Sequence, residues 1–181
     1  MVVLRTERLV LRPFTLDDVD FLFDMYSRWE VQRFIGRDPR VMEDRTEAIA
    51  RAERLAALEH PVRGVWAITD ATSERQYGAL LLKDLPASGP SAPLEASGET
   101  EIGWHLHPDA WGRGFASEAA SRVLRHAFDG GIERVLAVTH PMNTASQRVA
   151  QRIGMKDMGI TDDYYNTTCS LFGIDRPESD G

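Results

Sequence analysis

The sequence predicts a mixed α+β domain in which helices pack on a central sheet, and three observations support this. Apolar or alternating runs typical of strands are separated by helical patterns along the chain. Apolar residues recur with unbroken helical periodicity from Ala116 to Phe128, which ends at Gly130-Gly131. Arg134 to Thr139 is an apolar run that favours a strand buried on both faces. With 181 residues, we expect a single domain over residues 1–181.

The N-terminal half is expected to hold three strands and two helices. Arg8 to Phe14 alternates, which suits a first strand. Thr15 and Asp18 form a capping-box pattern ahead of a helix of about ten residues. The segment Arg28 to Arg40 shows no clear period. The remaining elements are a helix over about Asp44 to Glu59 and strands over Val65 to Thr69 and Tyr77 to Lys83.

The C-terminal half begins with residues 86–100, which hold three prolines, two glycines and three serines. Because predicted strands flank this segment directly, it is interpreted as a long mobile hairpin loop rather than a domain boundary. The elements expected after it are a strand over Glu101 to His107, the helix from about Ala116, the strand Arg134 to Thr139, a helix from Asn143 to Gly154, and strands near Lys156 to Ile160 and Thr167 to Ile174. Residues 176–181 are expected to form a disordered tail.

A glycine loop precedes the helix that starts at about Phe115 or Ala116. Gly112 and Gly114 flank Arg113, and free N–H groups and the helix dipole meet at this point, which favours a bound anion. A dinucleotide fingerprint does not fit, because Ser117 replaces its third glycine or alanine and four residues separate the strand from the first glycine. The loop therefore predicts a site for a phosphate or pyrophosphate group.

Two motifs carry a family resemblance. Trp111 to Ala116 resembles the Q/R-x-x-G-x-G/A pyrophosphate loop of the GCN5-related N-acetyltransferase (GNAT) superfamily, with Trp111 in place of Gln or Arg. Asn143 to Met155 resembles the N-x-x-S-x-x-v-a-x-x-x-G-[FM] helix of the same superfamily. The form WGRGFASEA is similar to the branch of ribosomal-protein N-terminal acetyltransferases (RimJ/RimL-like). The resemblance implies the GNAT fold, a mixed, mostly antiparallel, splayed sheet of about seven strands with about four helices.

The resemblance also implies acetyl-CoA as the co-substrate and no metal. Its pyrophosphate would lie on N–H groups from Gly112 to Ser117, and its pantetheine arm in the gap between the fourth and fifth strands. That arm would pair with backbone near Leu106, where a bulge would aim a free N–H at the thioester oxygen. Arg113 would add a charge contact or reach solvent. The expected cofactor-binding residues are Leu106, Trp111, Gly112, Arg113, Gly114, Phe115, Ala116, Ser117, Asn143 and Ser146.

Glu101 is the candidate general base, because it shares a strand face with Gly103, His105 and His107 and because a strand glutamate serves as base in histone-acetylating relatives. An ordered water or His105 is the alternative base. A metal held by the two histidines would lack a third ligand.

For the acid, Ala150 stands where many relatives carry a tyrosine. Ser146 stands where ribosomal N-terminal acetyltransferases use a serine, and is the candidate here. The alternative is that Ser146 only caps its helix.

The acceptor is expected to be a primary amine, on a small molecule or a protein N-terminus, acetylated directly in a ternary complex. Trp29 and Phe34 lie where the family covers its acceptor site, and Tyr165 lies between the last two strands. With His105, these are the expected substrate-binding residues. Cys169, which alternates with Leu171, is interpreted as a core residue.

Bulk properties limit the function classes. A net charge of −7 argues against a nucleic-acid surface, and no apolar run is long enough to span a membrane. The single cysteine and the charged start favour a cytoplasmic protein, either a monomer or a homodimer. Two rival functions remain open: a non-catalytic module that senses acyl-CoA, and the same fold using another acyl-CoA donor.

Overall fold

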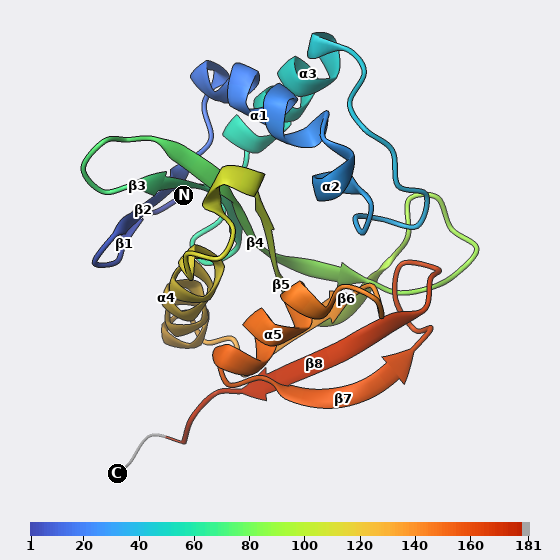
Figure 1. The fold of residues 1–181 in the computed structure, drawn as a ribbon. Helices are drawn as coiled ribbons and strands as arrows, with labels where there is room; N and C mark the ends of the chain where they lie inside the picture. Colours follow the sequence, from blue (N-terminus) through green and yellow to red (C-terminus); the bar gives the residue numbers. More distant parts are fainter. Residues whose placement is uncertain (179–181) are drawn as a thin grey trace.

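The computed structural model describes residues 1–178 and contains one eight-stranded sheet with helices on both faces (Figure 1). The sheet order is β1-β2-β3-β4-β5-β6-β8-β7. The strands are β1 (Leu4–Arg5), β2 (Leu9–Pro13), β3 (Gly64–Asp70), β4 (Gln76–Pro86), β5 (Ala96–Leu106), β6 (Arg134–Thr139), β7 (Lys156–Thr161) and β8 (Cys169–Asp175). The helices are α1 (Val19–Tyr26), α2 (Trp29–Gln32), α3 (Arg45–Ala56), α4 (Phe115–Asp129) and α5 (Thr144–Arg152), with 3₁₀ turns η1 (Leu16–Asp18) and η2 (Pro108–Ala110). The predicted α+β class is confirmed.

The sheet splays between β5 and β6. All other neighbouring strands pair antiparallel, whereas β5 and β6 are parallel and share one paired position, Glu101 with Leu136. Strand β5 stays paired to β4 over its whole C-terminal half, up to Gly78 with Leu106. Because β6 leaves β5 after one pair, a gap opens beside the second half of β5. The expected splay between the fourth and fifth predicted strands is confirmed.

Each face of the sheet carries its own apolar core. The helices α1, α2 and α3 cover one face and α4 and α5 the other, as the upper and lower helices of Figure 1 show. The apolar stripe of α4 is buried as its periodicity predicts, through Ala119, Ala120, Val123, Leu124, Ala127 and Phe128. The opposite core holds residues of α1 and α3, among them Leu22, Met25, Tyr26, Ala48 and Ala52. The strand β5 therefore presents one face to each core.

The predicted capping box is present. The Thr15 side chain accepts from the Asp17 N–H, and the Asp18 carboxylate accepts from the Thr15 N–H at 2.8 Å. Asp18 is fully buried, and both of its oxygens accept from the Arg12 guanidinium, at 2.9 and 2.7 Å. This network fixes the start of α1 against β2.

Within residues 1–178 the sheet has eight strands rather than about seven, and there are five α-helices rather than about four. The added strand is the two-residue β1, and the added helix is the four-residue α2 in the segment without clear period. Elements this short cannot show a hydrophobic period in a sequence window, so pattern reading misses them.

The hairpin between β4 and β5 is shorter than expected. Pairing continues to Pro86 with Ala96, so residues 87–95 form the loop rather than 86–100. The tip contacts the turn between β7 and β8: Ser88 N–H donates to Asp163 O at 2.7 Å, and Asn166 Nδ2 donates to Gly89 O at 2.9 Å.

The expected tail begins with an ordered residue. Arg176 donates to Glu133 through its backbone N–H and its side chain, at 2.7 and 3.0 Å. Residues 179–181 lie outside the described residues. Among residues 1–178, no helix is both long and apolar enough to cross a membrane.

Candidate functional site

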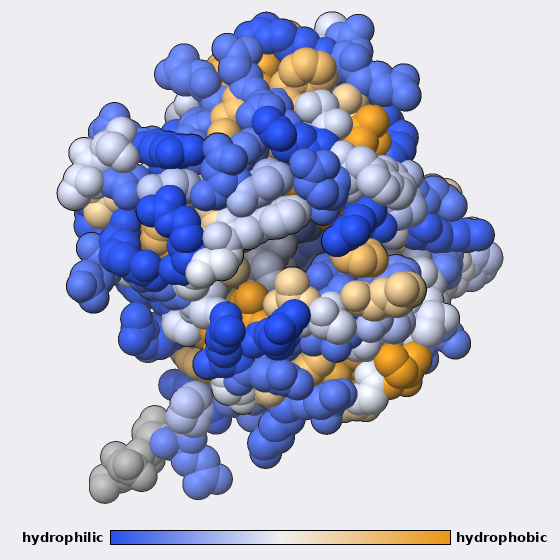
Figure 2. All heavy atoms as spheres, in the orientation of Figure 1, coloured by the Kyte–Doolittle hydropathy of each residue, from blue (hydrophilic) through white to orange (hydrophobic). Residues whose placement is uncertain are grey.

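A cavity of about 580 Å³ lies at the splay and opens on the face shown in Figure 2, where the surface is hollowed. Its walls come from both sides of the sheet: the second half of β5, the end of β6, the starts of α4 and α5, and the segment that includes α2. Volumes of this size hold small-molecule ligands in many proteins. Most of the predicted site residues line it, namely Phe34, Glu101, His105, Leu106, Trp111, Gly112, Gly114, Phe115, Ala116, Ser117, Asn143, Ser146 and Tyr165.

The glycine loop enters α4 through two left-handed residues. Gly112 has a φ of 72° and Gly114, the N-cap residue of α4, a φ of 78°. Other residues adopt this conformation only with strain. No atom lies within 4 Å of a Cβ built on Gly112, so the loop is open to an approaching group. The buried Ser117 hydroxyl has no hydrogen-bond partner among the described residues. An open helix N-terminus with an unpartnered donor fits the pyrophosphate of coenzyme A.

Arg113 does not point into the cavity. Its guanidinium lies 4.5 Å from the centre of the Phe115 ring and 5.3 Å from that of Tyr77, and it is absent from the cavity walls. Arg8 braces the same loop, since it donates to Arg113 O at 3.1 Å and pairs with Glu118 at 2.6 Å. Of the two alternatives for Arg113, this geometry favours a solvent-exposed side chain over a charge contact with the cofactor.

The cavity-facing edge of β5 offers backbone groups to a ligand. His107 N–H donates to Tyr77 O at 2.9 Å, and because pairing alternates along an antiparallel ladder, the backbone groups of Trp104 and Leu106 face the gap. Trp111 Nε1 donates to Leu106 O at 2.9 Å. The Leu106 N–H is therefore available to a ligand, while its carbonyl accepts from Trp111. Both the N–H and the carbonyl of Trp104 are available.

The prediction of a bulge near Leu106 is wrong. Pairing between β4 and β5 runs without a shift from Gly78–Leu106 to Asp84–Thr100. Departure of β6 already frees the edge of β5, so no bulge is needed to expose its N–H groups.

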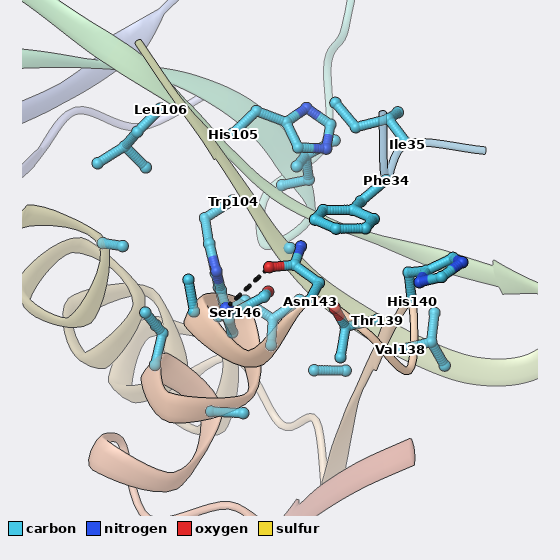
Figure 3. A pocket seen from close by; sticks show the side chains of 18 of the residues that line it. Phe34, Ile35, Trp104, His105, Leu106, Val138, Thr139, His140, Asn143 and Ser146 are labelled. Atoms are coloured by element: carbon cyan, nitrogen blue, oxygen red, sulfur yellow. Dashed lines mark hydrogen bonds between the residues drawn. The ribbon is translucent and has the colours of Figure 1, made fainter. Parts of the chain in front are cut away.

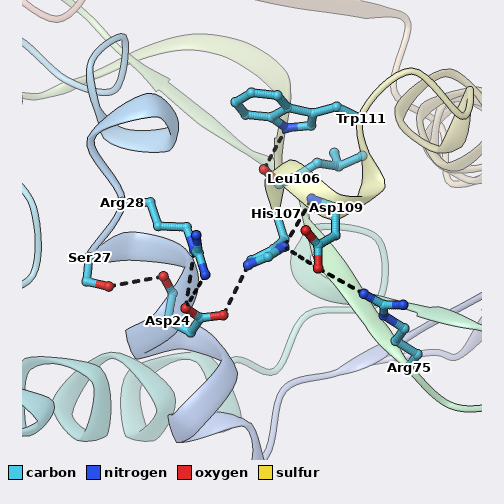
Figure 4. Close-up of polar contacts among 8 residues, drawn as sticks. All are labelled: Asp24, Ser27, Arg28, Arg75, Leu106, His107, Asp109 and Trp111. Atoms are coloured by element: carbon cyan, nitrogen blue, oxygen red, sulfur yellow. Dashed lines mark hydrogen bonds and ion pairs between the residues drawn. The ribbon is translucent and has the colours of Figure 1, made fainter.

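A polar network behind the glycine loop joins it to α1 (Figure 4). His107 Nδ1 accepts from Asp109 N–H at 3.2 Å, so Nε2 carries the proton and donates to Asp24 at 3.0 Å. Asp24 also pairs with Arg28 at 2.7 Å, and Asp109 with Arg75 at 3.0 Å. The network orients the turn that precedes Gly112.

Glu101 lies at the narrow end of the splay and is only 8% exposed. Its Oε2 accepts a hydrogen bond from the Tyr165 hydroxyl and lies 3.6 Å from Lys83 Nζ. Burial raises the pKa of the Glu101 carboxyl, while Lys83 and Tyr165 oppose the rise. A raised pKa makes this carboxylate a stronger base than an ordinary one, and it can accept a proton from an ammonium group in the cavity.

His105 occupies the same face of β5 but is not arranged as a base. Arg51 donates a hydrogen bond to the Tyr26 hydroxyl at 3.0 Å. The Tyr26 hydroxyl therefore donates its own hydrogen bond to His105 Nδ1, 2.9 Å away. Burial, with Arg51 and Lys83 nearby, lowers the pKa of His105 to about 3. The imidazole is therefore neutral with its proton on Nε2, which makes it a hydrogen-bond donor to the cavity.

The two histidines considered for a metal point to separate partners. His105 is bonded to Tyr26 and His107 to Asp24. Within residues 1–178, no group of three or more His, Cys, Asp or Glu side chains could hold a metal ion.

Asn143, rather than Ser146, caps α5. The Asn143 Oδ1 accepts from the Ser146 N–H at 3.2 Å, the dashed line in Figure 3. The Ser146 hydroxyl lines the cavity and forms none of the hydrogen bonds found among the described residues. It is therefore available to a ligand, whereas Ala150, where relatives carry a tyrosine, is buried.

The expected acceptor residues separate into two groups. Phe34 and Tyr165 line the cavity, and the Phe34 ring lies 5.0 Å from that of His140 at the end of β6 (Figure 3). Trp29 is 56% exposed and lies outside the cavity walls, because the single turn of α2 directs it to solvent. Cys169 is buried, and burial raises the pKa of its thiol to about 11, which agrees with a core role.

Sequence reasoning missed several cavity residues. Lys83 lies directly opposite Glu101 on β4, an oppositely charged cross-strand pair that only the register reveals. Arg148 and Arg152 line the cavity from α5, and their i, i+4 spacing was a signal available in the sequence. Tyr26 and Arg51 lie outside the cavity walls and act through His105 from α1 and α3, and no motif marks either residue.

Comparisons with known proteins agree with this geometry. The acetyltransferase (GNAT) domain family matches residues 8–156. An uncharacterized N-acetyltransferase of Bacillus subtilis, YoaA, is 32% identical over 164 residues, which cover 90% of this chain and 87% of that protein.

Solved structures show the same fold. A GNAT-family acetyltransferase from Bacillus anthracis superposes with a TM-score of 0.77 at 20% identity, over 97% of this chain and 99% of that chain. The ribosomal alpha-N-protein acetyltransferase RimL, in complex with coenzyme A, gives a TM-score of 0.76 at 17% identity, over 96% and 98%. With the splayed sheet, the glycine loop at α4 and the extent of the sequence match, the chain belongs to the GNAT family and is an acetyl-CoA-dependent N-acetyltransferase.

Proposed function

We propose that this protein transfers the acetyl group of acetyl-CoA directly to a primary amine that binds beside Glu101. The observation that carries the proposal is the buried Glu101 carboxylate, which shares one cavity with the glycine loop and the free Ser146 hydroxyl. When bound, acetyl-CoA supplies an acyl group activated as a thioester. In the net reaction, an ammonium acceptor and acetyl-CoA yield an N-acetylated amine, the free CoA thiol and one proton.

The donor would be held by backbone and by α5. The N–H groups from Gly112 to Ser117 would bind the pyrophosphate at the positive end of α4. The free edge groups of Trp104, with the Leu106 N–H, would pair with the pantetheine amides as an added strand. Arg148 and Arg152 would add positive charge from α5, in place of Arg113.

Proton transfer would use two side chains. Glu101 takes a proton from the ammonium group, which frees the nitrogen lone pair for attack on the carbonyl carbon. As the new C–N bond forms and the C–S bond breaks, the nitrogen loses its second proton to solvent, and the Ser146 hydroxyl donates a proton to the departing sulfur and recovers one from solvent. Glu101 passes its proton to solvent at the end of the cycle. Lys83 and Tyr165 favour the ionised form of the Glu101 carboxyl and so oppose the effect of its burial on the pKa.

Two measurements, made one after the other, test the proposal. Calorimetric titration with acetyl-CoA, with NAD as the control, should show saturable binding of acetyl-CoA alone. Free-thiol release with a panel of primary amines should then identify acceptors. No binding would refute the donor site, while binding without thiol release from any amine would favour the non-catalytic sensing module. Faster thiol release from a longer acyl-CoA than from acetyl-CoA would favour the same fold using another acyl-CoA donor.

A further inference from the structure

The acceptor side of the cavity is built around one face of β5. Glu101, Gly103 and His105 succeed one another on this face, and Leu81 and Lys83 lie opposite on β4. All five line the cavity. A ligand at Glu101 therefore rests on the backbone of Gly103, between a carboxylate and an imidazole.

The fold does not require a glycine at position 103. Its φ is outside the left-handed region, and an added Cβ would meet only Leu81 Cδ1, at 3.3 Å. By contrast, a Cβ on Gly78 would lie 2.2 Å from His105 O, so that glycine is needed for strand packing. A glycine inside a strand costs about 0.5–1 kcal/mol relative to alanine, and often marks a close approach by a ligand. The missing side chain at Gly103 leaves room above the strand.

The walls around this room are mostly apolar, although the charged residues Glu30 and Arg33 also line the cavity from the α2 segment. Val31, Phe34 and Ile35 approach from the α2 segment, and Leu81 from β4. Two nearby cations already have partners. The Arg33 guanidinium lies over the Phe34 ring at 4.7 Å, and Lys83 pairs with the Glu101 carboxylate.

Of the two polar groups that remain here, Glu101 Oε1 can accept from the ammonium form of the acceptor, and the His105 Nε2–H can donate only to a neutral group of the ligand. None of the hydrogen bonds and ion pairs among the described residues uses Glu101 Oε1. His105 Nε2 carries a proton, as its bond to Tyr26 requires. A ligand suited to this site has one basic nitrogen and an apolar remainder.

Two contacts enclose the acceptor side. Phe34 and His140 bring the α2 segment to the end of β6, with ring centres 5.0 Å apart. On the other side, the turn that carries Tyr165 is bound to the β4–β5 hairpin, where Gly89 N–H donates to Asn166 at 2.8 Å. These two contacts narrow the acceptor side, which favours a small amine over a polypeptide as the acceptor.

Building on the acetyl transfer proposed above, we infer that the acceptor is a small primary amine with an apolar substituent, and that Gly103 forms the floor beneath that substituent. Gly103 is then a specificity-determining position. Adding a methyl group there should exclude bulky acceptors and leave the donor site unchanged.

The test compares acceptors in the intact protein by thiol release from acetyl-CoA. The panel contains ethylamine, butylamine, benzylamine, phenethylamine, and hexapeptides with free N-termini. Phenethylamine or benzylamine should exceed ethylamine and every peptide in kcat/KM by about tenfold or more, as expected for apolar contacts of this size. Higher kcat/KM for the peptides would overturn the small-acceptor inference while leaving acetyl transfer intact.

The variant Gly103→Ala should lower kcat/KM for phenethylamine by about tenfold, chiefly through KM, with a smaller loss for ethylamine. Its acetyl-CoA affinity, measured by calorimetry, should match the wild type. Gly89→Ala is the matched control, because a Cβ there meets no atom within 4 Å, and it should change neither value. Equal losses for all amines would overturn the role of Gly103. Absence of thiol release with every amine and peptide would overturn the proposed acetyl transfer itself.

Discussion

The Tyr165 hydroxyl donates a hydrogen bond to the Glu101 carboxylate across 64 positions of sequence. Tyr165 has a left-handed φ of 58°, a conformation that costs a non-glycine residue about 1–2 kcal/mol. Contacts from Pro86, Ser88 and Gly89 hold the turn in place. Strain of this kind persists where surrounding structure imposes it, often at functional sites. The turn between β7 and β8 thus positions Tyr165 on the candidate base.

Replacing Tyr165 with phenylalanine should shift the pH profile of activity. A hydrogen bond to a carboxylate favours its charged form, so its loss raises the pKa of Glu101 further. The acidic limb of kcat/KM should therefore move to higher pH, by about one unit for a bond of about 1.5 kcal/mol. Tyr164→Phe, which changes the neighbouring residue of the turn, is the control. A profile identical to wild type would remove Tyr165 from the tuning of the base.

Replacing Glu101 with glutamine should lower kcat by about 10²–10⁴-fold, the usual contribution of a general base. Because the glycine loop is untouched, calorimetry should give unchanged acetyl-CoA affinity. Glu99→Gln, two residues earlier on β5 and outside the cavity walls, should retain full activity. A Glu101→Gln enzyme with wild-type kcat would show that water or another group deprotonates the acceptor.

The same substitution should change how stability depends on pH. The folded protein holds the Glu101 proton at higher pH than the unfolded chain, because burial raises its pKa above 4.5. Between these two pKa values the native state binds more protons, so the free energy of unfolding falls as pH rises. Urea denaturation at several pH values should show wild-type stability declining relative to Glu101→Gln as pH rises above 4.5. A constant difference would contradict the raised pKa.

Replacing Ser146 with alanine should lower kcat with little effect on acetyl-CoA affinity, since Asn143 supplies the helix cap. General-acid roles contribute about 10²-fold or more, which stopped-flow thiol detection can resolve. Thr144→Ala, at the exposed start of the same helix, is the control. Equal kcat values for the wild type and Ser146→Ala would remove this hydroxyl from the mechanism.

Replacing Asp18 with alanine should destabilise the protein by about 3–5 kcal/mol, because it leaves the Arg12 charge without its buried partner. The control is Asp20→Ala. Asp20 pairs with Arg45 but its side chain is 82% exposed, so its loss should cost less than about 1 kcal/mol. Urea denaturation curves measure both. Similar effects from the two substitutions would show that burial of Asp18 does not strengthen the pair.

Local features of the site could be predicted because each depends on neighbouring residues. Gly112 and Gly114 adopt the left-handed backbone that their loop suggests, and Thr15 and Asp18 form the capping box. The side chain of Asn143 caps α5, in the motif that identified the helix. Trp29 could not be placed in the same way, because its exposure follows from a single helical turn without a period.

The sequence by itself determined the class of fold, the glycine loop and the helices long enough to show a period, since periodicity, caps and glycines act over a few residues. Tertiary structure decided the partners of Glu101. Lys83 meets it through the β4–β5 register, and Tyr165 through a turn far along the chain. Tertiary structure also placed the Arg113 side chain against Phe115 instead of in the cavity. Such contacts depend on strand register and on the packing of distant segments, and no local pattern of residues encodes them.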